Sequence, residues 1–298
     1  MDGKILMQSI VISPDITKGN IAELTTWRIG GSCDRIIYPA SVEDLQFVIK
    51  KAKHENKKIA VIGYGSNLLV SDDGFDGYLI VLKKNFSKFY YEDDQTIVVE
   101  SGFACPRLAQ MTSKAGFNNL CFMAGIPGSV GGAVMMNAGA HHQAIMNYVK
   151  AVEIIDQQGH LHFYSRAQLN YEYRKTFLPS NGIVLRVWIN LEKTGLLSLQ
   201  YILNYRAETQ PLGDWSCGSV FKNPGDGVSA GKLIEDVGLK GFYYKNLQIS
   251  PKHANFIINK SSASSLEVQE LTKLIQQRVY LLTGFWLEPE YQYLKSIW

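Results

Sequence analysis

GIPGSVGGAVMMNAGA, at residues 125–140, is the stretch that decides how this sequence is expected to fold. It contains five glycines, one proline and no charged residue. Repeated glycine and an internal proline make an ordinary helix too costly, and the apolar side chains between them require burial, which excludes a flexible linker. We therefore expect main chain that approaches another group closely, so that its N–H groups reach a bound diphosphate. The alternative is a tightly packed turn that binds nothing.

A shorter glycine-rich segment, GYGSN at residues 63–67, joins two expected strands, 59–62 and 68–70. A loop between strands departs from the Rossmann fingerprint, in which the glycines open a helix. The two glycine runs lie on either side of a domain's worth of sheet. Together they suit an elongated ligand with a diphosphate, because main-chain N–H groups bind its charge without lysines.

Length and composition restrict the class of protein. The chain has 298 residues, 46% of them hydrophobic, which allows two domains of ordinary size or one large domain with an attached lobe. A formal net charge of +3 and the lack of a long basic block argue against a nucleic-acid surface. No run reaches the length of a membrane span and no secretory leader is recognised, so we expect a cytoplasmic protein without membrane insertion.

Cysteine and histidine spacing gives no sign of a metal. The four cysteines form no CxxC pair, which favours reduced thiols over a disulfide framework or a zinc site. His141 and His142 are adjacent and lack the spacing of metal ligands. We expect no metal site.

The order of expected elements indicates two domains. Strands and helices alternate irregularly up to about residue 192, which indicates an α+β domain with mixed sheets at 1–192 rather than a regular βαβ array. A second domain is placed at 193–298, where Ser264 and Glu267 cap an amphipathic helix that Gly284 ends. The other elements expected there are helices at 195–207 and 230–237 and strands at 253–259 and 285–293.

Polar side chains that suit catalysis lie on three other segments. GSVFKNP at 218–224 places a serine, a lysine and an asparagine beside turn-forming residues. Arg174 stands among tyrosines, where a guanidinium clamps a carboxylate or phosphate through two hydrogen bonds. Glu288 and Glu290 are two residues apart on an expected strand and so face the same side of it. Each has a plainer interpretation: a serine in a turn, an arginine in a structural ion pair and a solvated glutamate.

These segments together resemble the UDP-N-acetylenolpyruvoylglucosamine reductase family. The resemblance extends from about residue 24 to residue 291, and its blocks occur in the family's order. The short gap between Thr176 and Val187 resembles the branch that lacks an extra tyrosine-bearing loop. The matching blocks are TTWRIGG at 25–31, GYGSNLLVSDDGFDG at 63–77, AGIPGSVGGAVMMNAGA at 124–140, YRKTF at 173–177, GSVFKNP at 218–224, AGKLIEDVGLKG at 230–241, KHANFIIN at 252–259 and LEPE at 287–290.

The resemblance implies a flavoprotein of the α+β class. Its FAD-binding domain would be of the vanillyl-alcohol-oxidase-like (PCMH) type, with two α+β lobes at about 20–80 and 81–192 and FAD between them, followed by a smaller α+β substrate-binding domain. NADPH would reduce FAD, and UDP-N-acetylglucosamine enolpyruvate would then enter the same cleft. Hydride transfer from flavin N5 to C3 and protonation at C2 would give UDP-N-acetylmuramate for peptidoglycan synthesis.

The resemblance also implies roles for individual residues. Ser219 matches the proton donor to C2, Arg174 the arginine that binds the substrate carboxylate and stabilises the intermediate, and Glu290 the glutamate that assists protonation. Asn223 and Lys222 match the part of this block that contacts the sugar nucleotide. The positions that match the family's flavin-binding loops are Gly63, Gly65, Ser66, Asn67 and Leu68 in the first run, and Gly125, Ile126, Pro127, Gly128, Ser129, Gly132 and Ala133 in the second.

Some positions depart from the family pattern. NAGAHHQA at 137–144 replaces the usual NAGAYGxE, and Thr176 stands where the family usually has serine. Two other functions remain open: a related FAD-linked oxidase acting on another alcohol or sugar acid, and a non-catalytic flavin or sugar-nucleotide binder. The combination of GSVFKNP with LEPE argues against the first, and the retention of Ser219, Arg174 and Glu290 against the second.

Overall fold

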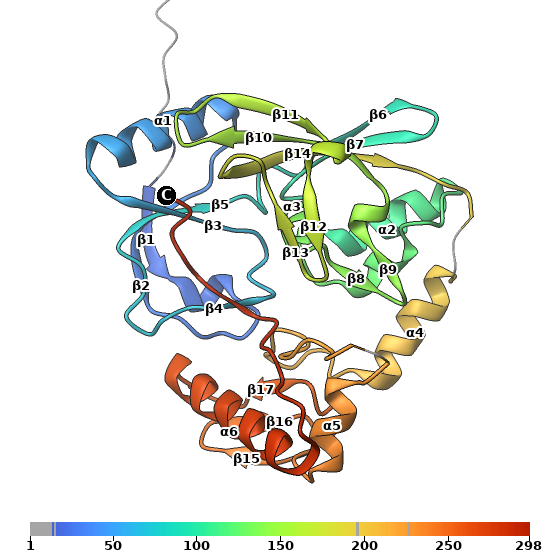
Figure 1. The fold of residues 1–298 in the computed structure, drawn as a ribbon. Helices are drawn as coiled ribbons and strands as arrows, with labels where there is room; N and C mark the ends of the chain where they lie inside the picture. Colours follow the sequence, from blue (N-terminus) through green and yellow to red (C-terminus); the bar gives the residue numbers. More distant parts are fainter. Residues whose placement is uncertain (1–13, 15, 195–196, 226) are drawn as a thin grey trace, which may run out of the picture.

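A computed structural model of the chain describes residues 14, 16–194, 197–225 and 227–298 (Figure 1). Its first part is a four-stranded sheet in the order β1-β2-β5-β3, with β1 at Ile16–Asn20, β2 at Ser32–Ile37, β5 at Gly77–Val81 and β3 at Lys58–Ile62. Strands β2, β5 and β3 run parallel, and β1 is antiparallel to β2. Helix α1 (Val42–His54) begins at Ser41, whose hydroxyl accepts the Asp44 N–H, and buries one apolar stripe against this sheet.

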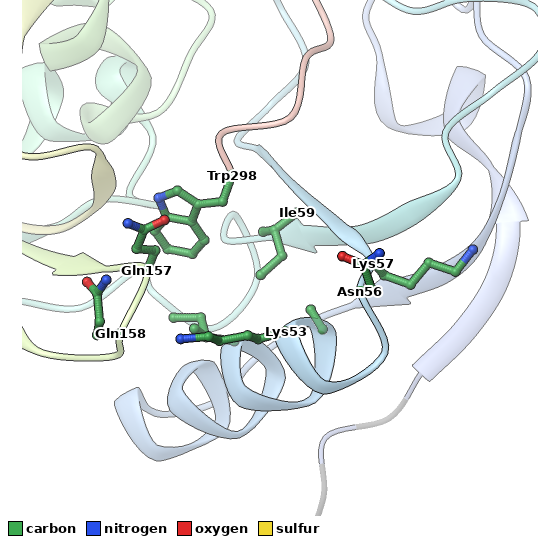
Figure 2. Close-up of a pocket in the computed structure, with 9 residues that line it drawn as sticks. Lys53, Asn56, Lys57, Ile59, Gln157, Gln158 and Trp298 are labelled. Atoms are coloured by element: carbon green, nitrogen blue, oxygen red, sulfur yellow. The ribbon is translucent and has the colours of Figure 1, made fainter.

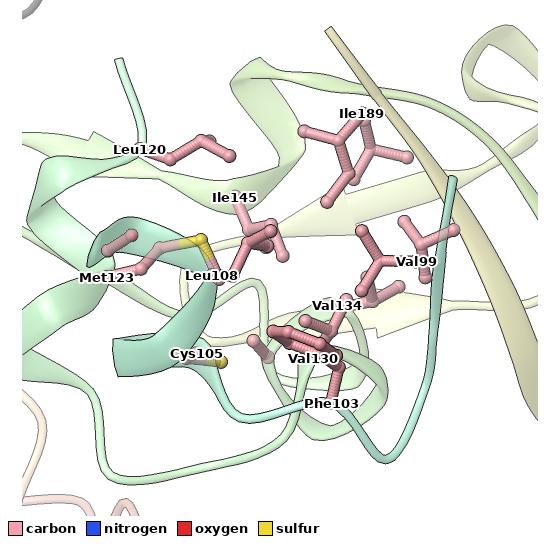
Figure 3. Close-up of a cluster of buried hydrophobic side chains, with 14 of the residues drawn as sticks. Val99, Phe103, Cys105, Leu108, Leu120, Met123, Val130, Val134, Ile145 and Ile189 are labelled. Carbon is pink, nitrogen blue, oxygen red and sulfur yellow. The ribbon is translucent and has the colours of Figure 1, made fainter. Parts of the chain in front are cut away.

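The second part is a five-stranded antiparallel sheet in the order β11-β10-β14-β7-β6. Helices α2 (Cys105–Lys114) and α3 (Val130–Met135) pack with it around a large apolar cluster, which Figure 3 shows with Val99 and Ile189 of the sheet opposite Val130 and Leu108. The cluster makes this part a core of its own. Its strands are β6 (Phe89–Asp93), β7 (Thr96–Glu100), β10 (Val149–Asp156), β11 (Leu161–Ser165) and β14 (Gly182–Asn190).

Short elements project from this second part. Strands β12 (Asn170–Glu172) and β13 (Lys175–Phe177) form a hairpin whose turn holds Arg174. The other short elements of the second part are strands β8 (Gly139–Ala140) and β9 (Gln143–Ala144) and 3-10 turns at Cys121–Gly125, Ile145–Asn147 and Arg166–Gln168; a further 3-10 turn, Ile21–Leu24, follows β1 in the first part.

The third part follows helix α4 (Leu199–Thr209), which lies between the second and third parts in Figure 1. Helix α6 (Ser265–Thr283) has the capping box expected from Ser264 and Glu267, and it ends at Gly284, whose φ of 77° is left-handed. Its other elements are helix α5 (Ala230–Asp236) and the three-stranded antiparallel sheet of β15 (Tyr243–Tyr244), β16 (Leu247–Ile249) and β17 (Ile257–Asn259).

The first and third parts share a core. Trp27 is fully buried and donates its indole N–H to the carbonyl of Ile257 at 2.8 Å. Trp27 and Leu69 belong to the same buried cluster as the side chains of α6. The tail of the chain then returns to the first sheet, where β18 (Gln292–Tyr293) pairs in parallel with β4 (Leu68–Leu69), as Figure 1 shows for the red segment. The first and third parts are therefore packed as one unit.

Several expectations from the sequence are wrong in detail. Part of the central glycine run, α3, is a helix after all, because glycine there allows close packing: a Cβ on Gly131 would lie 2.7 Å from Cβ of Ser101. The strand expected at 253–259 is only β17, since its first residues form a turn closed by Phe256 N–H to His253 O. The strand expected at 285–293 is only β18. Of the helix expected at 195–207, residues 195–196 lie outside the described residues, and the helix that is described is α4.

Candidate active site

The two glycine runs face each other. A Cβ built on Gly63 would lie 2.4 Å from Oγ of Ser129, and one built on Gly128 would lie 3.3 Å from Oγ of Ser66. Distances below about 3 Å are not tolerated by real side chains, so Gly63 is required for the first run to approach the second so closely. Segments more than sixty residues apart in sequence thus form the two sides of one site.

The first run presents free main-chain donors. Gly65 has a φ of +63°, and its carbonyl accepts the N–H of Thr26 at 3.1 Å, which fixes the loop against the preceding segment. Within the part of the chain that the structure describes, no N–H of residues 63–67 donates a hydrogen bond to protein. Consecutive free N–H groups in a turn form an anion-binding concavity, so this loop fits a diphosphate.

The second run is satisfied internally. The N–H groups of Ile126, Gly128 and Ala133 donate to carbonyls within 2.9 Å, and that of Gly132 donates to Oγ of Ser129, the N-cap of α3. Most of its N–H groups are therefore used within the protein; among the described residues of this run, that of Ser129 donates to no protein group. The carbonyl of Gly125 accepts a hydrogen bond from the guanidinium of Arg206 on α4.

The second group of expected residues centres on an ion pair. Nε of Arg174 lies 2.8 Å from Oε1 of Glu290, and both side chains are less than one-fifth exposed, at 18% and 17%. Nε has no aligned hydrogen-bond partner among the described residues, so the contact is an ion pair without a directed hydrogen bond. Arg174 has a φ of 63° at the hairpin turn, and its guanidinium lies 4.7 Å from the centre of the Tyr173 ring. A cation on an aromatic face is stabilised by the ring quadrupole.

Burial raises the pKa of Glu290, and the charges of Arg174 and Lys222 offset this only in part. A carboxyl in this setting takes up a proton more readily than one in water. Lys222 itself pairs with the exposed Glu288, with Nζ 2.7 Å from Oε1. The two glutamates of LEPE, expected on one side of a strand, thus have different environments, one buried and one solvated.

Ser219 lies beside Glu290 through the main chain. The N–H of Glu290 donates to the carbonyl of Val220 at 2.7 Å, and that of Lys222 donates to the carbonyl of Glu288 at 2.9 Å. Residues 219–222 and 288–290 therefore run as neighbouring antiparallel segments. The structure thus pairs Arg174 with Glu290 and brings the main chain of the segment that carries the partly buried Ser219 alongside Glu290. The role of Ser219 stays a prediction.

Two protein families match separate stretches of this chain. Residues 33–165 match the FAD binding domain family, and residues 210–294 match the C-terminal domain of UDP-N-acetylenolpyruvoylglucosamine reductase. The UDP-N-acetylenolpyruvoylglucosamine reductase of Prochlorococcus marinus (strain NATL2A) is 37% identical over 290 residues, covering 95% of this chain and 98% of that protein. The chain belongs to the UDP-N-acetylenolpyruvoylglucosamine reductase family. This confirms the family expected from the sequence.

Further relatives agree with this. The reductase of Heliobacterium modesticaldum is 38% identical over 271 residues, covering 89% of this chain and 86% of that protein. The crystal structure of the reductase from Thermus caldophilus superimposes with a TM-score of 0.81 at 32% identity, covering 95% of this chain and all of that one. The chain is thus an FAD-dependent oxidoreductase with an FAD-binding domain of the α+β class, as expected from the sequence.

Some expected contacts of this reductase family are already used within the protein. Oδ1 of Asn223 accepts the N–H of Ala230 at 3.0 Å and so caps α5, which leaves only its amide N–H groups for a sugar nucleotide. The side chain of Asn67 donates one N–H to the carbonyl of Glu290 at 3.1 Å, which leaves its other N–H, its Oδ1 and its main chain for a contact with FAD. The side chain of Leu68 packs on the apolar cluster of the first sheet. The cofactor and substrate roles of these residues stay predictions.

Sequence reasoning missed residues that hold the site in place. Asn255 is buried and exchanges two hydrogen bonds with the main chain of Phe221, next to Ser219. Asp72 accepts three hydrogen bonds from the N–H and hydroxyl of Ser265 at the start of α6, all within 3.0 Å. Both asparagine and aspartate lie in blocks that match the family, but a single sequence does not identify the partners of polar side chains.

Two pockets lie away from these residues. One, of about 270 Å³, lies between α1 and Trp298 and is lined by Ile49, Lys53 and Gln158 among others (Figure 2). A second, of about 310 Å³, adjoins it at Asn56. Neither pocket is lined by a residue of the glycine runs or of the Arg174–Glu290 pair. We identify the candidate active site by the chemistry of its residues, which these pockets lack.

The described residues contain neither a membrane-spanning helix nor a metal-binding cluster. Among them, no helix has the length and apolar character needed to cross a bilayer. In the same ranges, no three histidine, cysteine, aspartate or glutamate side chains come together in a way that would hold a metal ion.

Proposed function

We propose that the chain reduces UDP-N-acetylglucosamine enolpyruvate to UDP-N-acetylmuramate with NADPH as the hydride donor, as a step in peptidoglycan precursor synthesis. The observation that carries the proposal is the buried Arg174–Glu290 pair, 2.8 Å apart, beside the segment of Ser219. The family name of its relatives supports the same reaction. When bound, FAD would supply the redox chemistry, by which a hydride from NADPH reaches C3 of the enolpyruvyl group.

The residues of the first glycine run would hold the diphosphate of FAD. Their N–H groups have no protein partner among the described residues, and backbone amides bind phosphate oxygens without an added cation. On its other side this loop packs against the second glycine run, through the close contact between Gly63 and Ser129. The fit depends on main chain, which is why glycine occupies these positions.

Arg174 would bind the carboxylate of the substrate. Its Nε makes no directed hydrogen bond among the described residues. The guanidinium can therefore donate to a second carboxylate without breaking an existing hydrogen bond at Nε. A substrate carboxylate that shares this charge weakens the interaction that lowers the pKa of Glu290. Burial then dominates and favours the protonated form of Glu290.

Ser219 would deliver the proton to C2. A hydroxyl is a weak acid in water, so its use requires a neighbouring proton source and a site that stabilises the oxyanion that forms. Protonated Glu290, on the neighbouring segment, supplies the first, and the guanidinium of Arg174 supplies the second. Lys222 and Asn223 lie just after Ser219 and would contact the sugar nucleotide.

We also place the reaction in the cytoplasm. Within the described residues the cysteines Cys33, Cys105, Cys121 and Cys217 are free and buried, which supports a reducing compartment.

The proposal is tested by replacing Ser219 with alanine. In anaerobic stopped-flow experiments, Ser219→Ala is expected to leave flavin bleaching by NADPH within about twofold of the parent enzyme, and to slow reoxidation by the enolpyruvyl substrate by roughly a thousandfold. Ser261→Ala, at an exposed serine of the same part of the chain, is the control. Equal slowing of both half-reactions would contradict the proton-donor role, and a parent enzyme that does not turn over this substrate would overturn the function itself.

A further inference from the structure

The first glycine run and the LEPE segment are joined by hydrogen bonds. Nδ2 of Asn67 donates to the carbonyl of Glu290 at 3.1 Å, and the N–H of Gln292 donates to the carbonyl of Asn67 at 2.9 Å. The residues that follow continue this contact as the parallel pair of β4 and β18. Asn67 is the last residue of the loop that would hold the diphosphate. It is therefore bonded to the segment of Glu290 through both its side chain and its main-chain carbonyl.

We infer that Asn67 is a positioning residue for Glu290: its side-chain amide fixes the carboxyl-bearing residue relative to the flavin loop. The inference rests on the proposed function for its catalytic consequence. It assigns to Asn67 a task in addition to the cofactor contact expected from the sequence, because one side-chain N–H of Asn67 is donated to Glu290 within the protein.

Glu290 is held from three directions, and each contact fixes a different relationship. Its N–H donates to Val220, which sets its place beside Ser219, and its carboxylate pairs with Arg174 of the hairpin. Among the described residues, the bond from Asn67 to its carbonyl is the one that links Glu290 itself to the glycine run. Loss of that bond would loosen Glu290 relative to this loop, while the bond from the Gln292 N–H to the Asn67 carbonyl and the pairing of β4 with β18 still hold the segment.

The carbonyl of Glu290 has a second donor that provides a matched control. Nε2 of the exposed Gln292 lies 3.0 Å from the same oxygen. That bond spans only two residues of one segment, so it does not set the position of the segment relative to the loop. The variants Asn67→Ala and Gln292→Ala thus each remove one side-chain bond to the same atom, but only the first removes a bond between the loop and the tail.

The two variants are compared in the FAD-loaded enzyme. Asn67→Ala is expected to slow flavin reoxidation by the enolpyruvyl substrate about tenfold or more, with flavin reduction by NADPH and FAD affinity within about threefold of the parent, because a misplaced proton source affects only the second half-reaction. Gln292→Ala is expected to change neither rate by more than about twofold. The pH dependence of flavin reoxidation in Asn67→Ala should also shift, because Asn67 holds the residue whose carboxyl titrates, Glu290.

Hydrogen exchange provides a reading that does not depend on turnover. Peptides that cover residues 287–293 should exchange several-fold faster in Asn67→Ala than in the parent or in Gln292→Ala. Unchanged exchange in Asn67→Ala would overturn the inference. So would equal slowing of both half-reactions, or loss of FAD with normal rates after reconstitution, which would make Asn67 a cofactor contact. If the parent does not reduce the enolpyruvyl substrate, the proposed function fails, and the exchange result still decides whether Asn67 holds Glu290.

Discussion

Replacing Asn255 with leucine is expected to lower the free energy of unfolding by about 3 kcal/mol. Asn255 is 4% exposed. Its Nδ2 donates to the carbonyl of Phe221 at 2.8 Å, and its Oδ1 accepts the N–H of Phe221 at 2.9 Å, both in a buried setting. Leucine has a similar volume but no polar atom, so both main-chain groups of Phe221 would lose their side-chain partner.

The magnitude follows from what is left behind. A buried polar group without a partner costs about 1–3 kcal/mol, so two such groups cost about 2–6 kcal/mol. The gain from burying an apolar side chain in place of an amide offsets about 1–2 kcal/mol of this. The net loss of unfolding free energy is therefore about 3 kcal/mol, in the lower half of the range of about 2–6 kcal/mol for the two unpaired groups.

The loss is measured by urea denaturation of the FAD-loaded protein. With a slope of about 3 kcal/mol per molar for a chain of this size, the midpoint of Asn255→Leu should fall by about 1 M. Asn204→Leu, the same exchange at an exposed position of α4, is the control and should shift it by less than about 0.2 M. A fall of less than about 0.3 M for Asn255→Leu would show that the main chain of Phe221 finds other partners, and the reasoning from unsatisfied groups would be refuted.

Two further predictions concern the glycine contact and the hairpin of the second sheet. Gly63→Ala should weaken FAD binding about tenfold or more, because its Cβ would meet Oγ of Ser129 at 2.4 Å, and Ser129→Ala in the same chain should restore part of the affinity; flavin titration decides, and no recovery would count against the clash. Burial disfavours the charge of Asp156, but hydrogen bonds from His162 and neighbouring main chain outweigh it and lower the pKa of Asp156 to about 2. A lowered pKa stabilises the folded state above the unfolded value of about 3.9, and this stability is lost as the pH falls toward 2. The melting temperature of the parent should therefore fall more steeply below about pH 4 than that of Asp156→Asn. Parallel curves of melting temperature against pH would contradict this prediction.

Local features of the fold could be predicted because their causes lie within a few residues. The capping box at Ser264 and Glu267 and the left-handed Gly284 define α6 at both ends, as expected. The helix α3 could not be predicted in the same way. Glycine disfavours a helix locally, but contact between Gly131 and Ser101 rewards it, and that contact joins residues thirty apart.

The candidate site was predictable in composition and not in geometry. Resemblance to the family indicated Ser219, Arg174 and Glu290 together; the structure pairs Arg174 with Glu290 and brings the main chain of the Ser219 segment alongside Glu290. From the sequence alone each had a plainer interpretation, because an ion pair between Arg174 and Glu290 depends on how a hairpin and the chain's tail pack in space. The buried partners of Asn67 and Asn255 were missed for the same reason: nothing in a side-chain amide shows which distant main chain it will bond.

The core shared by the first and third parts restricts how a ligand could reach Glu290. Trp27 and its partners join these parts into one body, so they do not separate like two hinged jaws. The β12–β13 hairpin carries Arg174 at its turn and is bonded to the second part through both strands, by Oγ1 of Thr176 to the carbonyl of Val134 at 2.6 Å and by Nδ2 of Asn137 to the carbonyl of Glu172 at 3.0 Å. The charge beside Glu290 is therefore supplied across a boundary, from one body to the other, and any shift of the second part against the joined first and third parts would alter it.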